Sequence, residues 1–224
     1  MTAVFQGIGH TAVEEYDIHA PSVSHPKTPL RPRDGACLAP RMAERKFPDM
    51  WVDPEDDPRE TGETAVGEKA ILVDYLDRYR TTLEMKCEGL DAEQMARRSV
   101  PPSTMSLLGL VRHLARVEHS WCRRVLEGRM ELPRLYRTEE DRDLDFNGAV
   151  ADDAVVADAW ESWHREVDHA RCYLNGVDSL GERVLVDGDP VEIRDIIVHL
   201  VEEYARHLGH ADLLRECIDG RTGQ

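Results

Sequence analysis

The 224-residue sequence predicts an all-α protein, a four-helix bundle that follows a disordered, Pro-rich N-terminal extension. Four segments between residues 68 and 220 place apolar residues at three- and four-residue steps, the period of an amphipathic helix. No segment shows the alternation of a half-buried strand. Eight of the twelve prolines fall in residues 1–58, where too few aliphatic residues cluster to offset the entropy of ordering. We therefore predict an extension over residues 1–58 and a folded domain over residues 59–222.

The composition narrows the classes of function. A formal charge of −16 and a pI near 5.0 argue against binding to nucleic acid or to an anionic membrane, because both require a basic face. No apolar run approaches the roughly 18 residues of a spanning helix, and the N-terminus lacks the regions of a signal peptide. The five cysteines are scattered, which suits a reducing compartment. We therefore expect a cytoplasmic protein.

The first long helix is predicted from Glu68 to the helix-ending Gly89. Its apolar stripe consists of Ile71, Leu72, Tyr75, Leu76, Tyr79 and Leu83. The following Asp91-Ala-Glu-Gln94 has the form of a capping box, in which two side chains satisfy backbone groups reciprocally, and it predicts one short helical turn. Pro101-Pro102 then breaks the helical pattern.

The second long helix can be capped by Ser103 or Ser106, and Gly128 ends it. Its buried stripe consists of Leu110, His113, Leu114, Val117, Trp121 and Val125. Residues 129–151, which are acidic and irregular, form a long connection to the third helix.

The third helix can be capped by Asp152 or Asp153 and runs to Gly176. Its buried face consists of Val156, Trp160, Trp163, Val167, Ala170 and Leu174. A loop that contains Gly181, Gly188 and Pro190 leads into the fourth helix, over residues 193–220.

The fourth helix carries polar groups on the face that should be buried. Its apolar stripe consists of Ile196, Leu200, Leu214 and Ile218. Within it stand Glu203, His207 and His210, with His199 one turn before Glu203. A buried carboxylate with imidazoles is costly unless it is paired. A divalent metal could pair with these groups, and so could a cluster of hydrogen bonds in the core; this helix by itself fits both interpretations.

His113 in the stripe of the second helix favours the metal. Glu203 and His207 are four residues apart, so their side chains reach the same surface, and bundle cores build metal sites from facing helices in this way. Two imidazoles and one carboxylate make three protein ligands and leave a position for water or substrate. That number is typical of a catalytic site rather than a closed structural one.

Other patterns point less clearly to a site. Glu166-Val-Asp-His169 has the Glu-x-x-His form that di-iron bundles carry twice, but the sequence holds one copy. His119, His164 and His169 lie near charged residues and are expected at the surface. We interpret three further aromatic residues as part of the hydrophobic core, with the wall of a ligand-binding site as the less favoured alternative. They are Trp121, Trp160 and Trp163.

The blocks SLLGLVRHLARVEHSW (106–121) and HLVEEYARHLGHADLLRECIDG (199–220) resemble the DinB-like superfamily of small metalloproteins. The branch they resemble includes mycothiol-dependent maleylpyruvate isomerases and S-transferases. GEKAILVDYLDRYRTTLEMKCEGLDAEQ (67–94) is similar to the first helix of that branch, so the likeness covers roughly residues 60 to 222.

The resemblance implies a divalent metal bound by His113, Glu203 and His207, the three residues that the spacing had also indicated. The commonest superfamily pattern has three histidines, so Glu203 is a departure that resembles the mycothiol-using branch. A site with a carboxylate ligand can bind zinc, nickel, manganese or iron, and we expect zinc first. His210 stands where many members have Gln, and we assign it proton handling; His199 is expected to support the ligands, and both are our candidate catalytic residues.

These observations lead us to expect a metal-dependent enzyme that activates a low-molecular-weight thiol. The thiol would either be transferred to a small electrophile or assist the isomerisation of that electrophile. No cysteine falls on a metal-facing position, so the thiol should be a cosubstrate. Only the resemblance points to mycothiol. A metal-dependent hydrolase, a non-catalytic metal- or ligand-binding stress protein and an oxygen-activating iron site remain alternatives. The expected partners are small molecules, with neither nucleic acid nor membrane, and a homodimer is left open.

Overall fold

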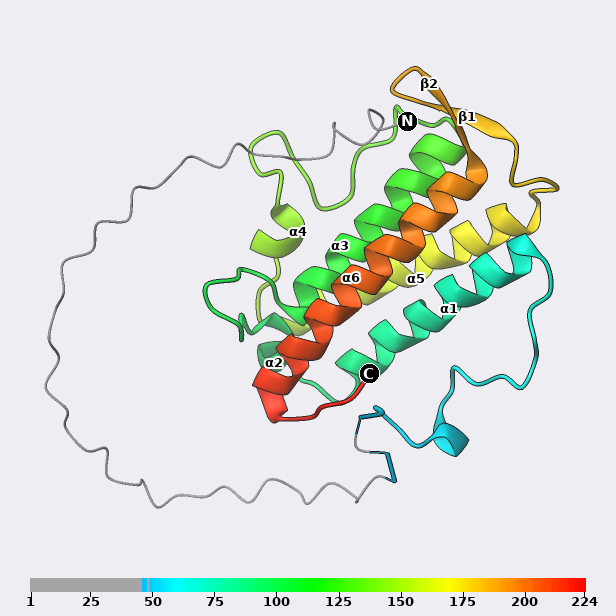
Figure 1. The fold of residues 1–224 in the computed structure, drawn as a ribbon. Helices are drawn as coiled ribbons and strands as arrows, with labels where there is room; N and C mark the ends of the chain where they lie inside the picture. The colour runs from blue at the N-terminus through cyan, green and yellow to red at the C-terminus, as the bar shows by residue number, and fades with distance from the viewer. Residues whose placement is uncertain (1–45, 48) are drawn as a thin grey trace, which may run out of the picture. The chain divides into compact units, whose positions relative to one another are not determined.

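The computed structural model describes residues 46, 47 and 49–224. Most of the predicted extension therefore lies outside the described residues. Four long helices confirm the predicted bundle (Figure 1). They are α1 (Glu68–Cys87), α3 (Leu107–Glu118), α5 (Asp153–Asn175) and α6 (Ile193–Asp219). The π-helix η2 (His119–Leu126) continues α3 directly. The short elements are η1 (Pro54–Asp56), α2 (Ala92–Ala96) and α4 (Leu144–Asn147).

The helix ends follow from local capping. Asp91 accepts a hydrogen bond from the backbone of Gln94, whose side chain accepts one from the backbone of Asp91, so the predicted capping box is present. Of the two serines offered for α3, Ser106 is the cap, and Asp152 caps α5. Gly220 ends α6 at a φ of 80°, a conformation that glycine adopts without a steric penalty.

The loop predicted before α6 contains a β-hairpin, so the prediction of a chain without strands is wrong at this point. Strands β1 (Arg183–Val186) and β2 (Asp189–Glu192) pair antiparallel. Asp187 and Gly188 join them with φ values of 52° and 96°, the positive pair that a tight hairpin turn needs. Strands of four residues, one of which contains Pro190, are too short to display an alternating pattern.

A polar cluster lies in the centre of the apolar core and joins all four long helices. Arg80 of α1 donates to both carboxylate oxygens of Glu118 on α3, each at 2.9 Å. Tyr204 of α6 donates to Glu118 at 2.9 Å, and Trp163 of α5 donates to the Tyr204 hydroxyl at 2.9 Å. All four side chains are buried, and each polar group has a partner, as a buried network requires.

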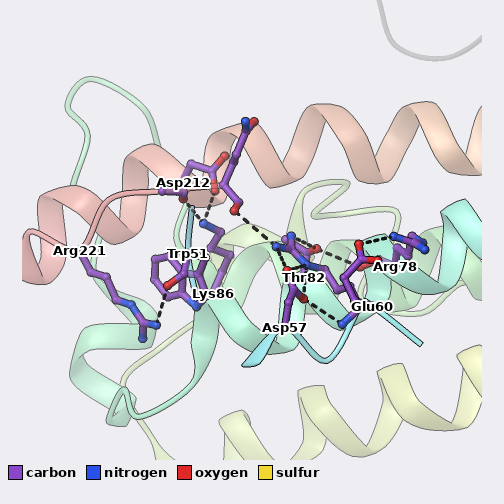
Figure 2. Close-up of polar contacts among 11 residues, drawn as sticks. Trp51, Asp57, Glu60, Arg78, Thr82, Lys86, Asp212 and Arg221 are labelled. Atoms are coloured by element: carbon purple, nitrogen blue, oxygen red, sulfur yellow. Dashed lines mark hydrogen bonds and ion pairs between the residues drawn. The ribbon is translucent and has the colours of Figure 1, made fainter. Parts of the chain in front are cut away.

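Residues just before residue 59 belong to the compact unit, which covers residues 45–224. Trp51 is only 1% exposed, with the Lys86 ammonium 3.9 Å and the Arg221 guanidinium 3.7 Å from its ring (Figure 2). Its backbone N–H donates to the carbonyl of Gln224 at 3.0 Å. Trp51 thus packs against the helical domain, although it lies before the boundary predicted at residue 59. The prediction rests on the average composition of residues 1–58, and a single tryptophan changes that average little. Trp51 nevertheless packs against Lys86 of α1 and against Arg221.

None of the helices in the described part of the chain is both long enough and apolar enough to cross a lipid bilayer.

Candidate metal centre

The three residues predicted as metal ligands come together in the structure. His113 lies on α3, while Glu203 and His207 lie one turn apart on α6, and these two helices pack against each other. The Nε2 atom of His207 is 3.4 Å, and that of His113 3.8 Å, from the same Glu203 oxygen, Oε2. Among the described residues this is the one group of ligand-type side chains whose donor atoms all lie within 4.8 Å of one another.

The separations fit a divalent cation. Ligand atoms about 2.0–2.1 Å from a four-coordinate metal lie about 3.4 Å apart at tetrahedral angles. The two distances to Glu203 Oε2 are close to that edge. The Glu203 side chain is 25% exposed, whereas those of His113 and His207 are 13% and 16% exposed. The group is therefore partly buried yet reached by solvent, as a site with a free coordination position requires.

Electrostatics favour the ionised carboxylate. Contacts with His113 and then His207 hold the pKa of Glu203 well below its ordinary value, although burial acts in the opposite direction. Burial lowers the pKa of His113, but the carboxylates of Asp145 and Glu203 outweigh it and leave that pKa above its ordinary value. A metal would therefore have to displace a proton from the His113 imidazole, whereas it would bind Glu203 as an ionised carboxylate.

The two candidate catalytic residues each lie beside one proposed ligand. The Nε2 atom of His199 is 3.4 Å from Oε1 of Glu203, the oxygen that faces away from His113 and His207. The rings of Trp121 and His199 meet edge to face, with centroids 4.9 Å apart. The Nδ1 atoms of His210 and His207 are 3.4 Å apart. The structure thus brings His199 and His210 to the site, while their roles stay predictions.

Sequence reasoning missed Asp145, which holds the other nitrogen of His113. Its Oδ2 lies 2.8 Å from His113 Nδ1, and the aspartate side chain has no solvent exposure. Phe146 stacks on the same imidazole, with ring centroids 5.3 Å apart. Residues 129–151 carry many acidic residues, so no local pattern distinguished this one.

The other histidines in the described part of the chain each contact a separate glutamate. The prediction that His119 lies at the surface is wrong: it is buried, 3.3 Å from Glu166 and 3.0 Å from the carbonyl of Pro133. His164 is exposed as expected, and half-buried His169 pairs with Glu127 at 2.9 Å. Glu166 and His169 thus have different partners. Of the tryptophans, Trp163 is fully buried, and Trp121 and Trp160 are half-buried.

A helical bundle in which two neighbouring helices present two imidazoles and a carboxylate, all partly exposed to solvent, defines a class of candidate metalloprotein. The family described as mycothiol-S-transferase matches residues 71–220. The chain belongs to this DinB-like family, which confirms the resemblance seen in its sequence.

Comparison with solved structures supports the fold. The chain is similar to the crystal structure of "the conserved protein of locus from Enterococcus faecalis", with a TM-score of 0.51 and 17% identity. The similarity covers 70% of this chain and 99% of that chain. A comparison with curated proteins gives no match.

Proposed function

We propose that this protein is a metal-dependent thiol S-transferase that uses a low-molecular-weight thiol of the mycothiol type and a small electrophile. The observation that carries the proposal is the cluster of His113, Glu203 and His207, three partly buried ligand-type side chains, within a mycothiol-S-transferase family member. Zinc is the metal we propose first, because two imidazoles, one carboxylate and an open position suit a catalytic zinc site. When bound there, a divalent cation lowers the pKa of a coordinated thiol.

The protein's own cysteines support a thiol cosubstrate. Cys87 and Cys122 are buried, and burial raises the pKa of the Cys87 thiol to about 12. Cys172 and Cys217 are exposed, and no cysteine in the described part of the chain belongs to the ligand cluster. Because none of these four cysteines lies at the site, the thiolate that we propose there belongs to a small molecule.

The residues around the ligands have separate proposed tasks. His199 contacts Oε1 of Glu203 and so keeps the second oxygen, Oε2, directed at His113 and His207. Burial and then His207 lower the pKa of His210, which favours the neutral imidazole that could take the proton lost by the thiol. The sulfur then forms a bond to the electrophilic carbon, and the proton leaves with the displaced group or returns to the addition product.

The test combines metal analysis with thiol consumption. Wild-type protein loaded with zinc should consume mycothiol when an alkylating electrophile is present, and His207→Ala should lose most of its metal and of this activity. The control is His164→Ala, an exposed histidine away from the cluster, which should retain both. Equal metal content in wild type and His207→Ala would reject the site. Turnover that does not require thiol would instead favour a hydrolase.

A further inference from the structure

The segment around α4 packs directly against the imidazole of His113. In Figure 1, α4 lies beside α3. Oδ2 of Asp145 meets Nδ1 of His113, and Phe146 stacks on the ring. His113 is therefore restrained from the side opposite Nε2, the nitrogen that faces Glu203.

The carboxylate of Asp145 is itself held by neighbouring groups. Its Oδ1 accepts a hydrogen bond from the backbone N–H of Phe146 at 3.1 Å, and its Oδ2 pairs with the Arg116 guanidinium at 3.1 Å. Arg112 donates to the carbonyls of Asp145 and Leu144 at 2.9 and 3.0 Å. Arg112 and Arg116 flank His113 on α3, so the helix that carries this imidazole also holds the segment that restrains it.

Two glycines permit this close approach. A Cβ atom at Gly109 of α3 would lie 2.7 Å from Cδ1 of Phe146. At Gly148, just after α4, it would lie 2.7 Å from the Arg112 guanidinium and 2.8 Å from the carbonyl of Leu144. Separations below 3.0 Å require movement, so a larger residue at Gly109 would displace Phe146, and one at Gly148 would displace Arg112 or the end of α4. The contact of Asp145 with His113 thus depends on several features of the packing.

We propose that Asp145 is a positioning residue that acts through His113; the proposal rests on the metal-dependent function given above. By accepting the Nδ1–H of His113, the carboxylate selects the tautomer whose Nε2 lone pair faces Glu203 and His207. It also fixes the ring orientation and makes the imidazole a better donor to a cation. The opposing interpretation is that Arg116, whose Nη2 lies 3.2 Å from His113 Nδ1 and 3.1 Å from Asp145 Oδ2, donates to both, so that Asp145 only pairs with Arg116 and stabilises the fold. The proton of a neutral His113 would then lie on Nε2, because a guanidinium has no acceptor.

The first test needs no variant and no metal. Nitrogen NMR of the metal-free wild-type protein, at a pH where His113 is neutral, reports which ring nitrogen carries the proton. We expect the Nδ1–H tautomer. An Nε2–H tautomer would overturn the proposal, whether or not the protein binds zinc.

The second test measures the zinc dissociation constant of the full chain by competition with a chromophoric chelator, at about pH 8.5 to limit competition by imidazole protons. Asp145→Asn should weaken zinc binding by about 10- to 100-fold, the range found when partners of metal-binding histidines are removed. Asp143→Asn is the matched control, because it removes the same charge from an exposed position two residues away and should leave the constant unchanged.

A double-mutant cycle separates positioning from a general effect of charge. In a His113→Ala background, Asp145→Asn should cause no further loss of zinc affinity. The proposal would be contradicted if Asp145→Asn weakened zinc binding equally in the wild-type and His113→Ala backgrounds. It would also be contradicted if the zinc dissociation constant of Asp145→Asn lay within twofold of that of Asp143→Asn. Failure of the wild type to bind zinc would count against the proposed function instead, and the tautomer would still decide the role of Asp145.

Discussion

Tyr204 donates a 2.9 Å hydrogen bond to Glu118 between α6 and α3, and neither side chain is exposed to solvent. Tyr204 directly follows Glu203, and Glu118 lies five residues after His113. The bond therefore ties together the two helices that carry the candidate ligands. Because Arg80 and Trp163 complete the cluster, its geometry limits how α6 can rotate relative to the rest of the bundle.

Tyr204→Phe should lower the free energy of unfolding by about 1–3 kcal/mol, because Glu118 loses one buried donor and Trp163 loses its acceptor. Urea unfolding of the metal-free protein measures the change. Tyr75→Phe is the control, since Tyr75 is 53% exposed and its replacement should have little effect. Equal stability of the two variants would show that the cluster contributes little to the fold.

Zinc affinity should fall as the pH is lowered, and the fall should begin above the range of an ordinary imidazole. The Asp145 and Glu203 carboxylates, acting against burial, raise the pKa of His113. A proton therefore occupies this ligand at a higher pH, and zinc must displace it. Dissociation constants measured between about pH 6 and pH 8.5 check the prediction. A constant that does not change across this range would contradict it.

Glu203→His should retain metal, since imidazole is also a good ligand, but should shift thiol-dependent turnover to lower pH. The reason is charge: replacing an anionic ligand by a neutral one leaves the site more positive by one unit, which favours thiolate at lower pH. The measurement is rate against pH with saturating thiol, for both proteins at equal metal loading. A shift to higher pH would reject the proposed thiolate chemistry.

Trp51→Ala should lower the free energy of unfolding by about 3–5 kcal/mol, because it removes a buried aromatic ring that Lys86 and Arg221 cover. A disordered extension over residues 1–58, as the composition predicts, has little to bury, so its deletion would leave the thermal midpoint nearly unchanged. The burial of Trp51 leads us to expect instead a fall of more than about 5 °C.

Thermal unfolding of Trp51→Ala and of the truncated protein, beside Val66→Ala, tests this expectation. Val66 is 82% exposed, so its variant should match the wild type. An unchanged midpoint in the truncated protein would restore the boundary at residue 58.

The sequence by itself determined the four long helices and the candidate ligands. Apolar periodicity and capping act within one or two turns, so they can be recognised without knowledge of the fold. Glu203 and His207 share a face because they are four residues apart, and His113 stands out because it interrupts an apolar stripe. Each of these signals is local.

The tertiary structure alone decided what surrounds those ligands. Asp145 meets His113 across 32 residues of sequence, and buried His119 contacts Glu166 across 47. Trp51 is buried, with the cations of Lys86, Arg215 and Arg221 over its ring. Contacts of this kind depend on the path of an irregular connection or a chain end. No periodic pattern encodes that path, because packing between distant segments selects it.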